Sequence, residues 1–125
     1  VKEFASLLEI FGFGVQKVKE IQKKRFFWAK EFSLKFQGVL VLKGANTIIA
    51  QNGVLYVCTF GSEALAKGGS GDVLAGIIGA LLAQKRTPLD AATNGVLAHT
   101  LAALKFKDNN YALTPEDLIE ELKWL

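Results

Sequence analysis

The sequence contains no methionine, one cysteine, one histidine and two prolines among its 125 residues. A single cysteine excludes an internal disulfide, and one cysteine with one histidine cannot supply the ligands of a zinc site, so we expect no metal site built from side chains. No apolar run reaches the roughly 18 residues that a membrane span requires, and nothing resembles a signal peptide. We therefore expect a cytoplasmic protein without a membrane partner.

Methionine is missing even from position 1, and the chain begins within an amphipathic pattern. We expect a piece of a longer protein, too short for more than one domain. The net charge is only +3, with 50% hydrophobic and 22% charged residues, a composition typical of a globular protein. Much of the positive charge is clustered in Lys17, Lys19, Lys23, Lys24 and Arg25.

These basic residues alternate with apolar ones at helical spacing, which predicts the solvated face of an amphipathic helix. Binding of this face to RNA is the alternative. We do not expect a nucleic-acid partner, because no aromatic side chains are interleaved on the polar side to stack against bases.

The spacing of apolar residues predicts an α/β protein. Val39-Leu40-Val41-Leu42 is a continuous apolar run, typical of a strand covered on both faces in a parallel sheet. Asn52-Gly53 joins two strand-forming stretches within 47–58 and predicts a β-hairpin. Helices are predicted over 2–11, 15–36, 73–84, 88–106 and 115–122. Because so few strands cannot cover these helices, we expect a missing N-terminal part to supply the rest of the sheet.

Three of the four consecutive residues 68–71 are glycines, just before the third of these helices: Gly68, Gly69 and Gly71. Residues without a Cβ allow backbone N–H groups to crowd around a ligand, and a helix start favours negative charge, so this loop predicts an anion site. A Gly-x-Gly-x-x-Gly fingerprint would need glycine where Leu74 stands, and no phosphate-loop motif ending in Gly-Lys-Ser/Thr occurs. Asp72 is either the helix N-cap or a catalytic carboxylate, and the glycines favour the second role.

The helix after this loop has no charged residue from Val73 to Gln84, so we expect it to be buried nearly all round. The run from Gly68 to Gln84, G-G-S-G-D-V-L-A-G-I-I-G-A-L-L-A-Q, resembles the ATP/ADP-dependent NAD(P)H-hydrate dehydratases of the ribokinase-like superfamily. Lys43-Gly44-Ala45-Asn46-Thr47 resembles a second motif of that family, and the likeness covers almost the whole chain. It implies that residues 1–125 are the C-terminal portion of a single three-layer αβα domain, with a mainly parallel sheet and a β-hairpin.

The resemblance also implies roles for individual residues. The nucleotide-binding residues would be Lys43, Gly44, Ala45, Asn46, Thr47 and Gly71. The backbone N–H groups of Gly69, Ser70 and Gly71 would form an anion hole, and Asp72 would contact the substrate as the catalytic base. From the residues alone, Lys43 at a strand end is either a surface lysine or a phosphate contact, and the neighbouring Gly44 favours phosphate.

The implied reaction is a hydro-lyase step of metabolite repair, in which hydrated NAD(P)H (NAD(P)HX) returns to NAD(P)H. ADP or ATP would be the co-substrate, with Mg²⁺ bridging its phosphates, and the enzyme would be a homo-oligomer, a tetramer being one option. This piece alone is expected to be inactive. The alternatives are a kinase of the same superfamily that phosphorylates a sugar or vitamin, and a fragment that only binds nucleotide. Glu63 and Lys67 depart from the family pattern at the loop entry, and the choice between ADP and ATP stays open.

Overall fold

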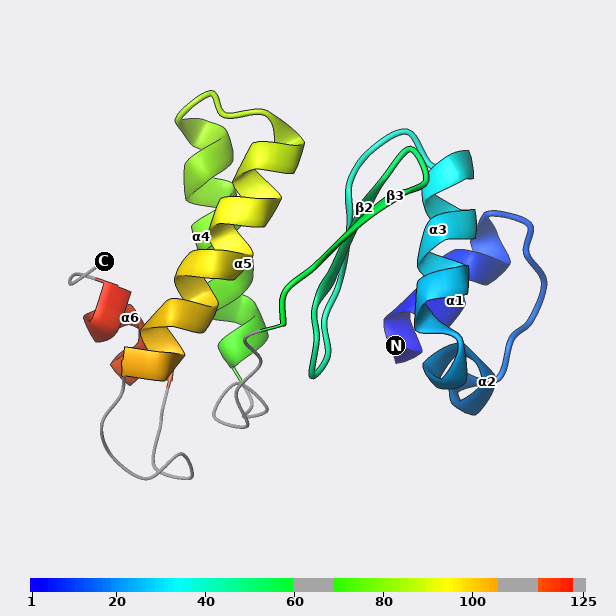
Figure 1. Cartoon of the computed structure of the whole chain (residues 1–125), viewed down its shortest axis with the longest axis horizontal. Coiled ribbons are helices and arrows are strands. Elements are labelled where there is room, and N and C mark those ends of the chain that lie inside the picture. Colours follow the sequence, from blue (N-terminus) through cyan, green and yellow to red (C-terminus); the bar gives the residue numbers. More distant parts are fainter. Residues whose placement is uncertain (60–68, 106–114, 123–125) are drawn as a thin grey trace. The chain divides into compact units, whose positions relative to one another are not determined.

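The computed structural model of the chain describes residues 1–59, 69–105 and 115–122. These residues belong to two compact units, Val1–Val57 and Cys58–Leu125. The first unit contains α1 (Lys2–Ile10), α2 (Val18–Lys23), α3 (Arg25–Lys35), β1 (Leu40–Leu42), β2 (Ile48–Gln51) and β3 (Val54–Val57), and the second contains α4 (Ser70–Ala83), α5 (Pro88–Lys105) and α6 (Pro115–Leu122) (Figure 1). The helices predicted over 2–11, 88–106 and 115–122 are confirmed.

The described strands form a three-stranded sheet in the order β1-β2-β3. Val41 pairs with Ile49 and Ile49 with Tyr56, both antiparallel. Asn52 and Gly53 have φ angles of 51° and 80°, so the predicted hairpin is confirmed with both turn residues in the left-handed region. The strand predicted over 39–42 is present as β1, but its described neighbour is antiparallel. The parallel strands expected of this fold class are not among the described residues.

The core of the first unit lies between α1, α3 and the sheet. Phe4 and Phe32 meet edge to face with ring centroids 5.5 Å apart, and Phe11 approaches Phe32 in the same manner at 5.1 Å. α3 packs on β2 and β3 (Figure 1). Ser33 on α3 accepts a 2.9 Å hydrogen bond from the Gly53 N–H, which fixes the hairpin turn against the helix.

The single helix predicted over 15–36 is wrong. The structure has two helices separated at Lys24, whose φ and ψ of −128° and 44° lie outside the helical region. Ile21 and Ala29 are buried as the apolar spacing predicts, whereas Val15 and Phe26 are exposed. Neither glycine nor proline marks the break, so the usual signals of a helix end are absent there.

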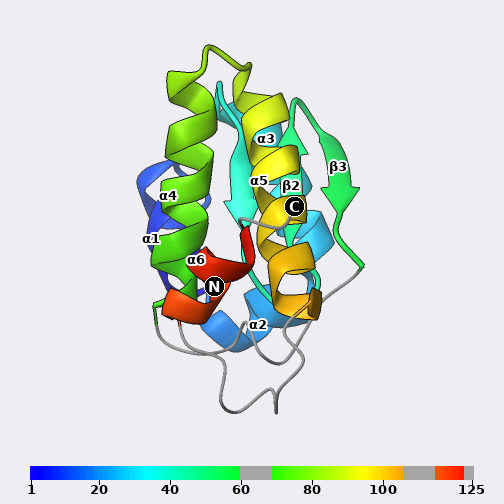
Figure 2. The ribbon, with the colours of Figure 1, turned by 90° about the vertical axis from the view of Figure 1, so that its left-hand side faces the viewer.

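In the second unit, α4 and α5 pack side by side, and α6 contacts both (Figures 1 and 2). Thr87-Pro88 is the residue order typical of a helix start and predicts a threonine cap, which is confirmed, because Thr87 Oγ1 accepts a 3.2 Å hydrogen bond from the Asp90 N–H. The same order at 114–115 predicts a cap at Thr114, which lies outside the described residues. Gly95 brings the two helices close together, since a Cβ there would lie 2.6 Å from Cγ1 of Ile78.

The prediction that α4 is buried nearly all round is wrong for this chain. Its buried residues are Ser70 and Leu74, whereas Leu82 is 44% exposed. α5 and α6 cover only part of its apolar surface. The apolar spacing of α5 predicts that Val96, Thr100 and three leucines face inward. Val96 and Thr100 are buried, but the three leucines, Leu97, Leu101 and Leu104, are exposed. None of the helices in the described ranges is long and apolar enough to cross a membrane.

Candidate functional site

The glycine loop leads directly into α4. Gly69 is the N-cap, and its φ of 89° lies in the left-handed region, which glycine adopts without strain. The first hydrogen bond of the helix is donated by the Val73 N–H to the Gly69 carbonyl over 3.2 Å. The N–H groups of Gly71 and Asp72 belong to the first turn of α4, where backbone N–H groups have no partner within the helix. The helix start lies directly after the glycine loop, where the sequence predicts an anion site.

Asp72 is the third residue of α4, so the interpretation of Asp72 as an N-cap is wrong. Its side chain is exposed. No hydrogen bond or ion pair joins the Asp72 carboxylate to the part of the chain that the structure describes. A carboxylate in the first turn gains from the positive end of the helix dipole. An exposed and uncommitted carboxylate in that position remains able to accept a proton from a bound hydroxyl group.

A groove of about 580 Å³ runs along α4 from this carboxylate towards α6. It is lined by Gly69, Asp72, Val73, Gly76, Ile77, Ala80, Ile119 and Leu122. Gly76 and Ala80 lie one turn apart and leave room for the groove, and the polar groups are concentrated at the Asp72 end. This arrangement suits a ligand with a reactive or charged group at one end and an apolar body.

The predicted anion hole falls at this helix start. Gly69 is the cap, and Ser70 and Gly71 are the first two helical residues, with Ser70 buried and Gly71 half-buried. Gly68 lies outside the described residues, as do Glu63 and Lys67, so the entry to the loop is not described. That these N–H groups bind an anion stays a prediction.

The second motif, residues 43–47, connects β1 to β2 in the first unit. β1 ends at Leu42, so Lys43 follows a buried strand directly, as predicted. Lys43, Gly44, Ala45 and Asn46 are exposed, and Thr47 is half-buried. The two sequence motifs thus belong to different compact units of the chain. That they form one nucleotide site stays a prediction.

Arg25 is the residue that the sequence interpretation missed. The spacing placed it on a solvated helix face, but its side chain is half-buried, and its Nη2 donates to the carbonyls of Leu42, Lys43 and Asn46 over 3.3, 3.4 and 3.1 Å. Burial lowers the pKa of the Arg25 guanidinium from its ordinary value, although arginine remains protonated in proteins. The sequence could not predict this role, because Arg25 lies in a basic cluster and its partners are at least 17 residues away in the chain.

Glu3 is a charged residue close enough to Lys43 for the two charges to interact. The pKa of the Glu3 carboxyl is lowered from its ordinary value, first because it accepts a hydrogen bond from its own backbone, with a smaller contribution from the charge of Lys43. Within the described ranges, no three His, Cys, Asp or Glu side chains are grouped so that they could hold a metal ion.

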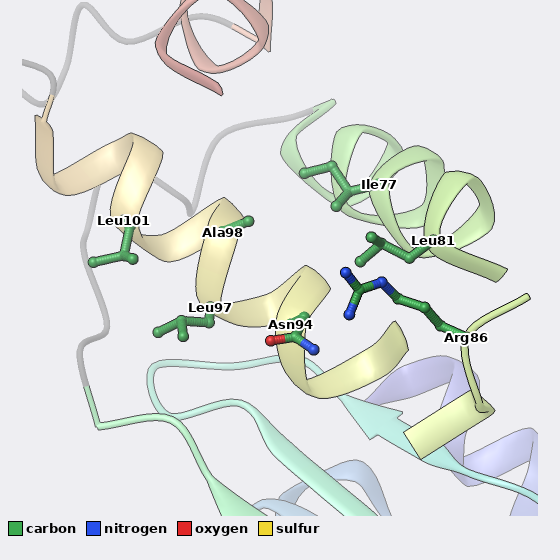
Figure 3. Close-up of a pocket in the computed structure, with 7 residues that line it drawn as sticks. All are labelled: Ile77, Leu81, Arg86, Asn94, Leu97, Ala98 and Leu101. Carbon is green, nitrogen blue, oxygen red and sulfur yellow. The ribbon is translucent and has the colours of Figure 1, made fainter. Parts of the chain in front are cut away.

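A smaller pocket of about 320 Å³ lies between α4 and α5 (Figure 3). Its walls are mainly aliphatic, and the Arg86 side chain reaches in between Leu81 and Asn94 (Figure 3). Asp90 binds both polar residues, accepting hydrogen bonds from Arg86 over 3.0 Å and from Asn94 over 2.7 Å. Because both of these polar residues are bound to Asp90, the pocket has the character of a helix interface more than of a reactive site.

The sequence profile of the Carb_kinase family, described as NAD(P)H-hydrate dehydratase, matches residues 1–123. The chain belongs to the NAD(P)H-hydrate dehydratase family. The bifunctional NAD(P)H-hydrate repair enzyme of Helicobacter pylori is 54% identical to it over 125 residues, which are 99% of the chain and 26% of that enzyme. The ADP-dependent (S)-NAD(P)H-hydrate dehydratase of Bacillus subtilis is 40% identical over 107 residues, 85% of the chain and 39% of that enzyme.

A crystal structure of the ADP/ATP-dependent NAD(P)H-hydrate dehydratase of Bacillus subtilis, obtained with ATP and Mg²⁺, has the same fold. Its TM-score to the chain is 0.80 at 37% identity, over 86% of the chain and 40% of that structure. The fold class predicted from the sequence is therefore confirmed. The chain spans about a quarter to two-fifths of the length of these members of the NAD(P)H-hydrate dehydratase family.

Proposed function

We propose that the chain is the C-terminal portion of a single ribokinase-like domain. The complete protein would use ADP or ATP to dehydrate NAD(P)HX back to NAD(P)H. The observation that carries this proposal is the start of α4, where the backbone of the glycine loop enters the helix and the exposed Asp72 carboxylate lies at one end of a groove. Membership of the dehydratase family and the relatives that share this part of the sequence support the same reaction.

In this proposal Asp72 takes the proton from the hydroxyl group on the hydrated nicotinamide ring. The hydroxyl oxygen then accepts a phosphoryl group from the nucleotide, which converts a poor leaving group into a good one. Departure of phosphate, together with loss of a proton from the adjacent ring carbon to solvent, restores the ring double bond. The N–H groups at the start of α4 stabilise the charge on the phosphoryl oxygens, because donors fixed in advance need no rearrangement as the charge develops.

The nucleotide would bind to the segment 43–47 and to Gly71. A dehydratase of Bacillus subtilis was crystallised with ATP and Mg²⁺, and the similar sequence from that organism is described as ADP-dependent, so both nucleotides are candidates. Mg²⁺ commonly binds through one or two carboxylates together with the phosphates of a nucleotide. Within the described ranges no group of side chains forms a dedicated metal cage, so Mg²⁺ would be held mainly by the nucleotide phosphates and Asp72 would stay available as the base. When bound, Mg²⁺ would neutralise phosphate charge.

The test is an assay of the full-length protein with NADHX. We expect ADP or ATP to restore the near-ultraviolet absorbance of NADH, and neither nucleotide should be consumed without the hydrate. A protein that leaves the hydrate unchanged but phosphorylates a sugar or vitamin alcohol would be a kinase of the same superfamily, and the dehydratase proposal would be wrong.

Lys43→Ala in the full-length protein is expected to weaken ADP and ATP binding about tenfold. The exposed ammonium follows the end of a buried strand, where a hydrogen bond to a charged group contributes about 1.5–3 kcal/mol. Calorimetry of both nucleotides measures the effect, with Lys19→Ala, another exposed lysine of the first unit, as the matched control. Equal affinities for wild type and Lys43→Ala would assign Lys43 to the solvated surface.

The 125-residue chain alone is expected to show no dehydratase turnover, since it spans only part of its relatives and exposes apolar residues of α4 and α5. The same NADHX assay on the purified chain tests this, with the full-length protein as the positive control. Turnover comparable to that of the full-length protein would show that residues 1–125 hold the whole site. Homo-oligomeric assembly and a cytoplasmic location stay predictions, to be checked by light scattering and by fractionation of cells.

A further inference from the structure

Arg25 joins α3 to the segment between β1 and β2. It is the first residue of α3, immediately after the break at Lys24, and one nitrogen of its guanidinium lies within 3.1–3.4 Å of three carbonyl oxygens. Those carbonyls belong to Leu42, Lys43 and Asn46, so they bracket the motif from the last residue of β1 almost to its end. These hydrogen bonds hold the exposed turn in one conformation. Without them, the conformational entropy of the turn would oppose that order.

Gly44 lies directly against this guanidinium. A Cβ at that position would be 2.5 Å from Nη2 and 2.8 Å from Cζ of Arg25. The φ angle of Gly44 is outside the left-handed region, so backbone conformation does not require glycine there. A methyl group at position 44 would therefore have to displace the guanidinium from its place against the segment 43–47.

We propose that Arg25 is a positioning residue for nucleotide binding, and that Gly44 is glycine in order to accommodate it. The proposal rests on the function proposed above, in which residues 43–47 contact the nucleotide. Arg25 itself need not touch the ligand. Arg25 holds the carbonyl groups of this segment against its guanidinium. The face of the segment away from Arg25, with the Lys43 side chain, is then left to contact the nucleotide.

Arg25→Lys distinguishes a positioning role from a role of the positive charge alone. Lys would keep the positive charge, but its compact ammonium lacks the planar fork of arginine. If Arg25 acted only through its charge, Arg25→Lys would retain nucleotide affinity. If it acts by positioning three carbonyls, Arg25→Lys should lose most of the affinity that Arg25→Ala loses.

The experiment measures kcat and KM for ADP, ATP and NADHX in the full-length protein, together with calorimetric nucleotide affinity and melting temperature. We expect Arg25→Ala to raise the nucleotide KM about tenfold, equivalent to about 1.4 kcal/mol. The KM for NADHX should stay constant, and kcat at saturating nucleotide should fall much less than kcat/KM. Arg25→Lys should resemble Arg25→Ala, and Lys24→Ala, the adjacent exposed cation, should resemble wild type.

A double-mutant cycle tests the role of Gly44. Gly44→Ala should raise the nucleotide KM when Arg25 is present, because the new methyl group displaces the guanidinium. It should have little further effect in Arg25→Ala, where the space is free, and such non-additivity is the signature of direct coupling. The Gly44→Ala and Arg25→Lys variants also keep the proposal testable if Arg25→Ala does not fold.

Three outcomes would overturn the proposal. A nucleotide KM within twofold of wild type in Arg25→Ala, with or without a lower melting temperature, would make Arg25 a purely structural residue. Additive effects in the cycle would separate Gly44 from Arg25. Wild-type protein that binds neither ADP nor ATP would overturn this inference together with the proposed function, whereas normal binding by wild type and by Arg25→Ala would overturn the inference alone.

Discussion

Asp72→Asn in the full-length protein is expected to lower turnover by about 10²–10⁴-fold, the usual contribution of a positioned general base. The amide has the same size as the carboxylate but cannot accept the hydroxyl proton. Nucleotide binding should persist, because the backbone donors at the start of α4 and the segment 43–47 are unchanged. Kinetics with NADHX and calorimetry with ADP and ATP measure the two properties separately.

Asp72→Asn should change the chemistry of the site with little effect on the stability of α4. Because the cap is Gly69, no capping hydrogen bond of Asp72 is lost, and the loss of charge in the first helical turn costs about 0.3–1 kcal/mol of stability. Asp90→Asn is a matched control, since Asp90 is also the third residue of its helix and sits near a helix start without a proposed catalytic role. We expect Asp90→Asn to shift the melting temperature slightly and to retain turnover. Activity of Asp72→Asn within about threefold of wild type would remove Asp72 from the reaction.

Phe32→Ala is expected to lower the free energy of unfolding by about 3–5 kcal/mol, as is usual when a buried aromatic ring is deleted from a core. Phe32 is 1% exposed and makes ring contacts with Phe4, Phe11 and Phe36. Removal of the ring leaves a cavity in the centre of the first unit that these neighbours cannot fill without moving. Denaturant unfolding of the full-length protein measures the loss.

Phe26→Ala is the control for that experiment. Phe26 lies on the same helix but is 55% exposed, so its truncation should change stability by about 0.5 kcal/mol or less. Similar losses for Phe26→Ala and Phe32→Ala would mean that Phe26 is also buried in the full-length protein, and the core as described would then be incomplete on that side.

The features that could be predicted from the sequence have short-range causes. Asn52-Gly53 specifies the hairpin through its own backbone preferences, and Thr87 caps α5 through a bond three residues along the chain. The candidate site was equally accessible, because the glycines and Asp72 lie within a few consecutive positions at a helix start. Family resemblance then supplied the chemistry that spacing alone could not.

The features that could not be predicted depend on contacts between distant residues. The bonds from Arg25 to Leu42 and Asn46 join segments that are far apart in sequence, so helical periodicity cannot predict them. The break at Lys24 has no glycine or proline to predict it. The burial of α4 was overestimated for a related reason. The lack of charge on α4 indicates how much of the helix is covered in the complete protein. In this chain its main contacts are with α5 and α6.

The close approach of α4 and α5 at Gly95 has an evolutionary consequence. A Cβ at position 95 would collide with the Ile78 side chain, so even alanine there requires that side chain or α4 to move. Ile78 and Asp72 belong to the same 14-residue helix, so a shift of α4 at Ile78 would also move Asp72. Among homologues that keep the reaction, position 95 should therefore admit larger residues only with a compensating reduction at position 78. Positions 95 and 78 would therefore covary among homologues, although neither is proposed to contact the substrate.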